Sequence, residues 1–232
     1  MDLIHNNDIN VFSENFSVPE KSYLKIIIAW IIFGILATVI EILQTFFILG
    51  AILFLFIEHR KKRWPKSIIG LKKNAFRQDM KNNWWLILMV GFGTQILAIS
   101  LIVWFSPQTI IHIVNRLPLL VDGSINMLSV ITLFIMLIFS TLGEELVFRD
   151  LLQNRLGWYI PPIAANLIIS ILFGVLHYSP GIIAIVLFDI VPIIIDSVIY
   201  GLLWDRTKNI VIPWIAHWLA DWIGLVCLLI LI

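Results

Sequence analysis

Long apolar runs separated by short polar segments follow one another along most of this chain. The first run covers residues 23–57, and further helical spans are predicted at residues 84–105, 126–155, 160–178, 182–204 and 210–232. A helix needs about 20 apolar residues to cross the hydrocarbon core of a bilayer. The first run exceeds that length, and we interpret it as one long, tilted helix, with a broken helix or a hairpin as the alternative. The pattern predicts an all-α polytopic membrane helix bundle with about six transmembrane helices.

Composition agrees with a membrane location. Hydrophobic residues make up 60% of the sequence and charged residues 13%, whereas about 25% of the residues in soluble domains are charged. The single cysteine, Cys227, excludes an internal disulfide and a cysteine-based zinc site. Residues 1–22 are polar and lack the basic start and apolar stretch of a cleavable signal peptide, so we expect a polar N-terminal tail.

Positive charge is concentrated in a basic loop, residues 58–83. Residues 59–81 contain nine lysines and arginines and one acid, Asp79. The positive-inside rule places this loop in the cytoplasm, where lipid headgroups rather than nucleic acid are its expected partners. Six spans then leave both ends of the chain outside, whereas a hairpin in the first run moves the N-terminus inside.

A first group of ionisable residues lies in the third span. Such residues cost roughly 2.5–3.5 kcal/mol each at the centre of a bilayer, so they usually face a protein interior or a water-filled cavity. Glu145 and Arg149 are four residues apart, share one helix face and can neutralise each other. Glu144 then has no local partner and is suited to act as a general base. Structural ion pairs to another helix are the alternative interpretation.

Two histidines lie in later spans. His177 is close to the end of the fourth span, where an interfacial histidine is an equally good interpretation, and Phe173 is four residues earlier on the same face. His217 and Asp221 are also four residues apart and share one helix face. Asp221 either orients His217 for chemistry, binds a metal together with it, or forms a structural hydrogen bond with it. Together with Glu144 these residues form a constellation for hydrolysis, in which a base activates water and donors hold the oxyanion.

These spacings resemble the CPBP family of intramembrane proteases, which includes the type II CAAX prenyl endopeptidase and bacterial bacteriocin-immunity proteins. The family pattern is Glu-Glu-x-x-x-Arg, then Phe-x-x-x-His, then His-x-x-x-Asn or Asp. All three motifs occur here in this order, within residues 126–224, as Glu144-Glu145…Arg149, Phe173…His177 and His217…Asp221.

The resemblance implies functional roles for these residues. The catalytic set comprises Glu144, His177, His217 and Asp221, and the supporting residues are Glu145, Arg149 and Phe173. Glu144 activates water with the help of His177, and His217 and Asp221 stabilise the oxyanion. Because an ionised aspartate cannot donate a hydrogen bond, Asp221 must be protonated, orient His217 or bind a metal. We favour a metal-free glutamate protease, and the alternative is a metalloprotease with zinc held by the four catalytic residues.

The sequence thus divides into a polar tail (1–22), an N-terminal transmembrane region (23–125) and a CPBP-like catalytic helix bundle (126–224) whose last helix continues to residue 232. We predict an intramembrane endopeptidase of a bacterial cell membrane with a peptide or protein-tail substrate. It acts in CAAX-type processing or in bacteriocin maturation and self-immunity. The alternatives are a non-catalytic immunity or peptide-binding protein and a proton-coupled transporter.

Three further acids lie within apolar segments. Asp189 and Asp196 are seven residues apart on one face of the fifth span, and we hypothesise that one of them pairs with Arg149. Glu41 either lines the cavity or marks a helix break in the first run.

Overall fold

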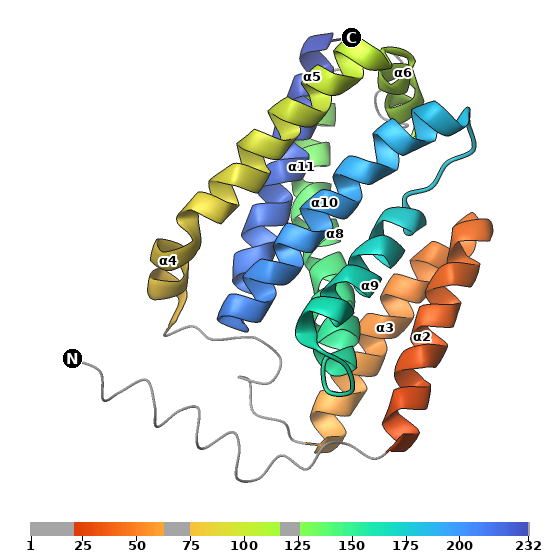
Figure 1. Cartoon of the computed structure of the whole chain (residues 1–232), viewed down its shortest axis with the longest axis vertical. Coiled ribbons are helices and arrows are strands. Elements are labelled where there is room, and N and C mark those ends of the chain that lie inside the picture. The colour runs from red at the N-terminus through yellow and green to blue at the C-terminus, as the bar shows by residue number, and fades with distance from the viewer. Residues whose placement is uncertain (1–20, 63–74, 117–125, 232) are drawn as a thin grey trace.

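Helices form all the regular structure in the residues that the structure describes, which are 21–62, 75–116 and 126–231 (Figure 1). This computed structural model begins with α2 (Lys21–Val39) and α3 (Glu41–Lys62). A second group comprises α4 (Phe76–Leu88), the π-helical segment η2 (Met89–Thr94), α5 (Gln95–Phe105) and α6 (Gln108–Val114). The third group comprises α8 (Met127–Glu145), the π-helical segment η3 (Leu146–Asn154), α9 (Pro162–Leu176), α10 (Ile183–Thr207) and α11 (Val211–Leu231).

Five of these segments are long and apolar enough to cross a membrane. They are Leu43–Arg60, Phe76–Phe105, Met127–Asn154, Ile183–Thr207 and Val211–Leu231. Two shorter apolar helices, Tyr23–Val39 and Pro162–Leu176, complete the apolar part of the described chain. The prediction of a polytopic helical membrane bundle is therefore confirmed.

The first apolar run folds as a helical hairpin. α2 ends at Val39, α3 begins at Glu41, and the two helices run side by side in opposite directions (Figure 1). The ring of Phe47 contacts those of Trp30 and Phe33 at centroid distances of 6.0 and 5.8 Å. As one helix, this run would extend about 50 Å, well beyond the ~30 Å hydrocarbon core. The single tilted helix is therefore wrong, and the hairpin alternative is correct.

The hairpin also changes the predicted topology. Because its helices are antiparallel, α2 begins at the end of the bundle where α3 ends, and α11 finishes at the opposite end (Figure 1). The prediction that six spans leave both ends of the chain on one side is therefore wrong. The backbone of Glu41 opens α3, directly after the break at Ile40, as one of its two predicted roles requires. Its side chain lies outside the described part of the chain.

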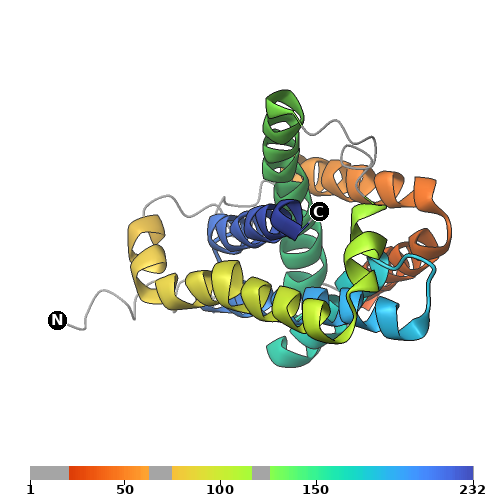
Figure 2. The same cartoon turned by 90° about the horizontal axis from the view of Figure 1, so that it is seen from above.

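α11 lies inside the bundle, in contact with α8, α10 and the continuous α4–η2–α5 segment (Figure 2). α9 and α10 approach each other closely at two glycines. A Cβ atom at Gly201 would overlap the side chain of Asn166, and one at Gly174 would overlap Ile194. Small residues of this kind let transmembrane helices pack tightly. α10 thus contacts η3, α9 and α11, each of which carries part of one of the three motifs.

A buried network joins the hairpin to the segment after η3. Arg155 Nη2 lies 2.9 Å from Glu58 Oε2, and Arg155 Nε donates to the hydroxyl of Tyr23 at 3.2 Å. Tyr23 in turn donates to Glu58. The side chains of Arg155 and Glu58 are only 1% and 5% exposed. One cluster thus ties α2 and α3 to the C-terminal half of the chain.

Replacing Glu58 with alanine deprives the buried Arg155 guanidinium of this carboxylate. Removal of one member of a buried ion pair costs about 3–5 kcal/mol, so we expect a clearly lower unfolding temperature for the detergent-solubilised protein. Lys208→Ala is the control, because Lys208 is 43% exposed in its pair with Asp205 and exposed pairs contribute about 0–1 kcal/mol. Equal unfolding temperatures for the two variants would contradict the assigned role.

Candidate functional site

The Glu-Glu-x-x-x-Arg motif lies where α8 changes into the π-helical segment η3. Such segments within helices are frequent at functional sites. Arg149 Nε donates to Glu145 Oε2 at 3.1 Å, and both side chains are fully buried. Arg149 also donates through Nη1 to Gln153 Oε1 at 3.1 Å and through Nη2 to Ser197 Oγ at 2.8 Å. The predicted pairing of Glu145 with Arg149 is confirmed, and Ser197 fixes it to α10.

His217 lies among three carboxylates. Its Nδ1 is 2.8 Å from Glu145 Oε1, while its Nε2 is 3.8 Å from Glu144 Oε2 and 3.6 Å from Asp221 Oδ2. Glu145 therefore binds Arg149 through one oxygen and His217 through the other. The sequence did not predict the contact between Glu145 and His217, which joins α8 to α11.

Aromatic rings fix the orientation of both histidines. Tyr200 stacks on His217 with a centroid distance of 4.6 Å and an interplanar angle of 20°. Phe173 lies between the two histidines, with its centroid 5.5 Å from that of His217 and 4.8 Å from that of His177. His177 Nδ1 is 2.8 Å from the carbonyl oxygen of Phe173. Because a carbonyl only accepts, we assign the proton to Nδ1, which leaves Nε2 of the neutral ring as an acceptor.

Glu144 and His177 line one cavity of about 980 Å³. The side chain of Glu144 is 25% exposed, whereas that of Glu145 is completely buried. The remaining wall comes from the turn of the hairpin, the end of α6 and the segment after α9, and includes Thr38, Gln44, Asn115, Arg116 and Ser179. Of the two adjacent glutamates, Glu144 is thus the one that reaches the cavity.

The hypothesis that Asp189 or Asp196 pairs with Arg149 is wrong. Ser197 supplies the contact between Arg149 and α10, and adjacent residues on a helix point about 100° apart. Asp196 instead accepts a hydrogen bond from Gln95 Nε2 at 2.6 Å, which connects α10 to α5.

Asp189 belongs to a polar cluster at the rim of the cavity. It accepts a hydrogen bond from Arg116 Nη2 at 2.5 Å and lies 3.6 Å from His112 Nε2. Arg116 Nη1 donates to the carbonyl oxygen of His177 at 2.6 Å, and His112 Nε2 lies 2.7 Å from Ser179 Oγ. The cluster fixes α6 and the segment that carries His177 to the start of α10.

Sequence reasoning missed several residues that shape this site. Ser197, Tyr200 and Gly201 have the three- and four-residue spacing of one helix face, so a signal for a functional face of α10 was present. Arg116 was visible as a lone base in an otherwise nearly uncharged segment. Neither the spacing on α10 nor the isolated charge of Arg116 indicates which residues of other helices these side chains contact.

The arrangement of donor groups bears on the zinc alternative. Within residues 21–62, 75–116 and 126–231, no three histidine, cysteine, aspartate or glutamate side chains are placed to hold one together. One nitrogen of each histidine is engaged, His217 Nδ1 by Glu145 and His177 Nδ1 by the carbonyl of Phe173. A histidine that binds a metal commonly makes such a contact through its other nitrogen, so these contacts leave Nε2 of both rings available. The metal-free reaction and the zinc alternative at Glu144, His177, His217 and Asp221 both stay predictions.

Substitution of Asp189 by alanine frees Arg116 from α10 and loosens the segment that follows α9. We expect faster amide hydrogen exchange in residues 177–182, measured by mass spectrometry on the solubilised protein. Asp205→Asn, at the other end of α10 in a half-buried pair with Lys208, is the matched control and should leave this segment unchanged. Unaltered exchange in the Asp189 variant would show that the cluster does not hold the segment.

Comparison with known proteins gives one match. Neither a curated protein nor a solved structure was found to match the chain. Residues 126–223 match the family model described as Type II CAAX prenyl endopeptidase Rce1-like. The matched range contains all three motifs, while the hairpin and α4–α6 lie outside it. The part of the chain that carries Glu144, His177 and His217 is therefore similar to the type II CAAX prenyl endopeptidase Rce1-like family.

Proposed function

We propose that this protein is an intramembrane endopeptidase in which Glu144 activates the attacking water. The observation that carries this proposal is the juxtaposition, within a transmembrane bundle, of Glu144 and His177 on one cavity and of His217 beside Glu144. The family match supports a peptide or protein tail as substrate. A bilayer-embedded hydrolase needs water inside the bundle, and polar groups lining a cavity give that water a place.

Glu144 is suited to be the base because Glu145 is already engaged. Both oxygens of Glu145 are occupied, one by Arg149 and one by His217. Glu144 instead faces the cavity, where a water molecule can reach its carboxylate. His177 lines the same cavity and offers Nε2 as an acceptor that helps to orient the water.

His217 is suited to stabilise the oxyanion. Its Nδ1–H donates to Glu145, so its position is fixed before substrate arrives. Its Nε2 points toward Glu144 and Asp221, the region where the reacting carbonyl must lie. A proton on Nε2 lets the ring donate to the oxyanion, and the Glu145 carboxylate balances the charge of the resulting imidazolium.

The proposed reaction balances within these groups. The water oxygen bonds to the carbonyl carbon while Glu144 takes one water proton, and the carbonyl oxygen becomes an oxyanion that accepts from His217 Nε2. The C–N bond then breaks, and Glu144 returns its proton to the leaving nitrogen. The products are a carboxylic acid and an amine, and Glu144 is again a carboxylate.

Asp221 most simply orients His217. Its Oδ2 lies 3.6 Å from His217 Nε2, and its side chain is 38% exposed. An ionised carboxylate cannot donate to an oxyanion, so we assign it this orienting role and propose a reaction without a metal ion. The same hydrolase would serve in processing a protein tail, in maturing a bacteriocin or in destroying a membrane-active peptide.

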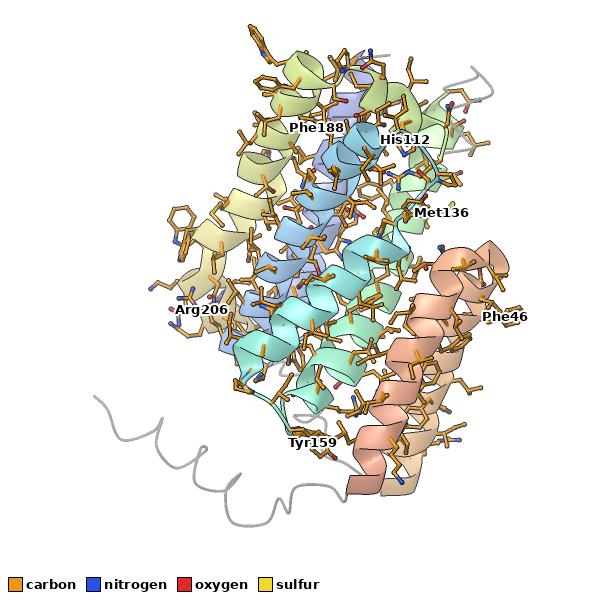
Figure 3. The ribbon with its side chains drawn as sticks, turned by 45° about the vertical axis from the view of Figure 1, so that its right-hand side comes forward. Phe46, His112, Met136, Tyr159, Phe188 and Arg206 are labelled. Atoms are coloured by element: carbon orange, nitrogen blue, oxygen red, sulfur yellow. The ribbon has the colours of Figure 1, made fainter. Side chains whose placement is uncertain are left out.

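Charge distribution supports a cytoplasmic location for the end of the bundle at which α3 ends, which we call the basic end. The described basic residues at this end are Lys25, Arg60, Arg77, Lys81, Arg155, Arg206 and Lys208. In Figure 3, Tyr159 lies toward this end, His112 lies toward the opposite end, and Arg206 lies at an intermediate height. Cytoplasmic flanks of transmembrane helices are rich in lysine and arginine.

Glu144→Gln removes the base and leaves its size almost unchanged. We expect cleavage of a fluorogenic peptide to fall by about 10²–10⁴-fold, with the unfolding temperature unaltered. The peptide is tested with and without a prenylated C-terminal Cys-a-a-X sequence, in buffer containing a chelator, with purified protein in detergent.

Asp205→Asn provides the matched acid-to-amide control in the same assay, because Asp205 lies at the basic end and pairs with Lys208. A folded Glu144→Gln variant with wild-type activity would defeat the hydrolase proposal. If such a variant has no activity on peptides but still protects cells from a membrane-active peptide, the protein is a binding protein in that role.

Asp221→Asn tests the orienting role. Asparagine can still accept a hydrogen bond from His217 and can also donate one to an oxyanion, so we expect cleavage activity to be retained. Asp221→Leu keeps a similar volume without polar atoms and should lower the rate. Complete inactivation of the asparagine variant, measured beside Glu144→Gln, would show that Asp221 needs its negative charge.

A further inference from the structure

One side of α4 carries a stripe of basic and aromatic residues that is turned away from the bundle. Arg77, Lys81, Trp84 and Trp85 are all exposed. At 100° per residue, their side chains leave the helix within a sector of about 100°. The buried residues of α4 are Asn83, Leu86 and Ile87. These buried residues leave the helix on roughly the opposite side, so the stripe faces the surroundings of the protein.

Arg206 extends this stripe onto α10. The guanidinium carbon of Arg206 lies 5.7 Å from the centre of the Trp85 ring, and its side chain is exposed. α10 contacts α4, and the end of α10 lies beside α4 in Figure 1. The contact between the cation and the ring holds Arg206 next to the stripe. We call the stripe and Arg206 together the α4–α10 basic patch, which groups three cations with two exposed tryptophans.

The cations of this patch are not paired with acids of the described chain. Within residues 21–62, 75–116 and 126–231, no carboxylate lies within ion-pair distance of any of the three. The nearby acids have other partners. Asp79 accepts a hydrogen bond from Asn209 at 3.0 Å, and Asp205 lies 2.7 Å from Lys208 Nζ. Because like charges repel one another, an anion bound from outside would stabilise the patch.

The position of the patch along α4 indicates the kind of anion. Residues 76–83 are mainly polar, and the helix becomes apolar from Trp84 onward. This point of α4 therefore lies at the boundary between water and hydrocarbon, where exposed tryptophans are typically found among lipid headgroups. Phospholipids carry their phosphates at the same depth, and clustered lysines and arginines favour the anionic ones.

We propose that the α4–α10 basic patch binds the headgroup of one anionic phospholipid, whose phosphate bridges α4 and α10. Arg77 and Lys81 face the phosphate from α4, Arg206 donates to it from α10, and the two tryptophans pack against the glycerol region. A zwitterionic lipid is a poorer partner, because its own cation is repelled by the three cations of the patch. The site is separate from the cavity at Glu144 and does not depend on the proposed peptidase function.

Stabilisation by added lipid tests the site. The purified protein in non-ionic detergent is titrated with phosphatidylglycerol, phosphatidylcholine or soluble glycerol 3-phosphate, and its unfolding temperature is measured. Because a ligand that binds the folded protein stabilises it, we expect phosphatidylglycerol to raise the unfolding temperature well above the values with the other two. An equal rise with phosphatidylcholine would show that anionic charge is not recognised. An equal rise with glycerol 3-phosphate would identify a free phosphate as the ligand, and either result would overturn the proposal.

Arg206→Gln removes the contribution of α10 to the site. We expect the phosphatidylglycerol concentration that gives half of the rise to increase about fivefold, with the unfolding temperature in detergent alone unaltered. Arg60→Gln is the matched control, because Arg60 is also exposed and lies 5.0 Å from an aromatic ring, that of Phe56, but is on α3 outside the patch. No weakening by Arg206→Gln, or equal weakening by both variants, would overturn the assignment of this site.

Discussion

The site depends on a single buried carboxylate with two partners. Glu145 receives Arg149 on one oxygen and His217 on the other, and all three side chains are almost inaccessible to solvent. A buried charge without partners is strongly unfavourable in an apolar surrounding, so removal of either partner penalises the remaining charges. This arrangement holds α8 and α11 in register, and Arg149 extends it to α10 through Ser197. It also leaves Glu144 as the glutamate that faces the cavity.

The family match and the cavity do not have the same boundaries. The motif residues lie within residues 126–223, but the hairpin and the end of α6, outside this range, supply much of the cavity wall. Gln44 even donates to the carbonyl of Leu176 at 3.2 Å, so that the hairpin contacts the end of α9 beside His177. The shape that a substrate meets is therefore determined largely by the part of the chain that the family pattern does not describe.

Contacts within one helix were predictable, and contacts between helices were not. The pairing of Glu145 with Arg149 follows from a four-residue spacing, which places both on one helix face. Asp189 and Arg116 are 73 residues apart, and no periodicity links them. Hydropathy likewise indicated the apolar run that became α2 and α3, but the tight turn at Ile40 lies within that run, and the polar Glu41 beside it was its signal. Which residues form a helix can thus be predicted from the local sequence, whereas the residues that a side chain contacts on another helix depend on tertiary packing.

The hairpin has a consequence for how the protein enters its membrane. Five segments of the described chain are long enough to cross a membrane, and α2 and α9 are shorter apolar helices. α2 begins and α11 finishes at opposite ends of the bundle (Figure 1). A helical hairpin with a short turn can insert as a unit, because its backbone groups are satisfied within the helices and only the turn must pass through the lipid. During synthesis, α2 and α3 would be inserted before the helices that carry the three motifs, which would then assemble against a hairpin that is already in place.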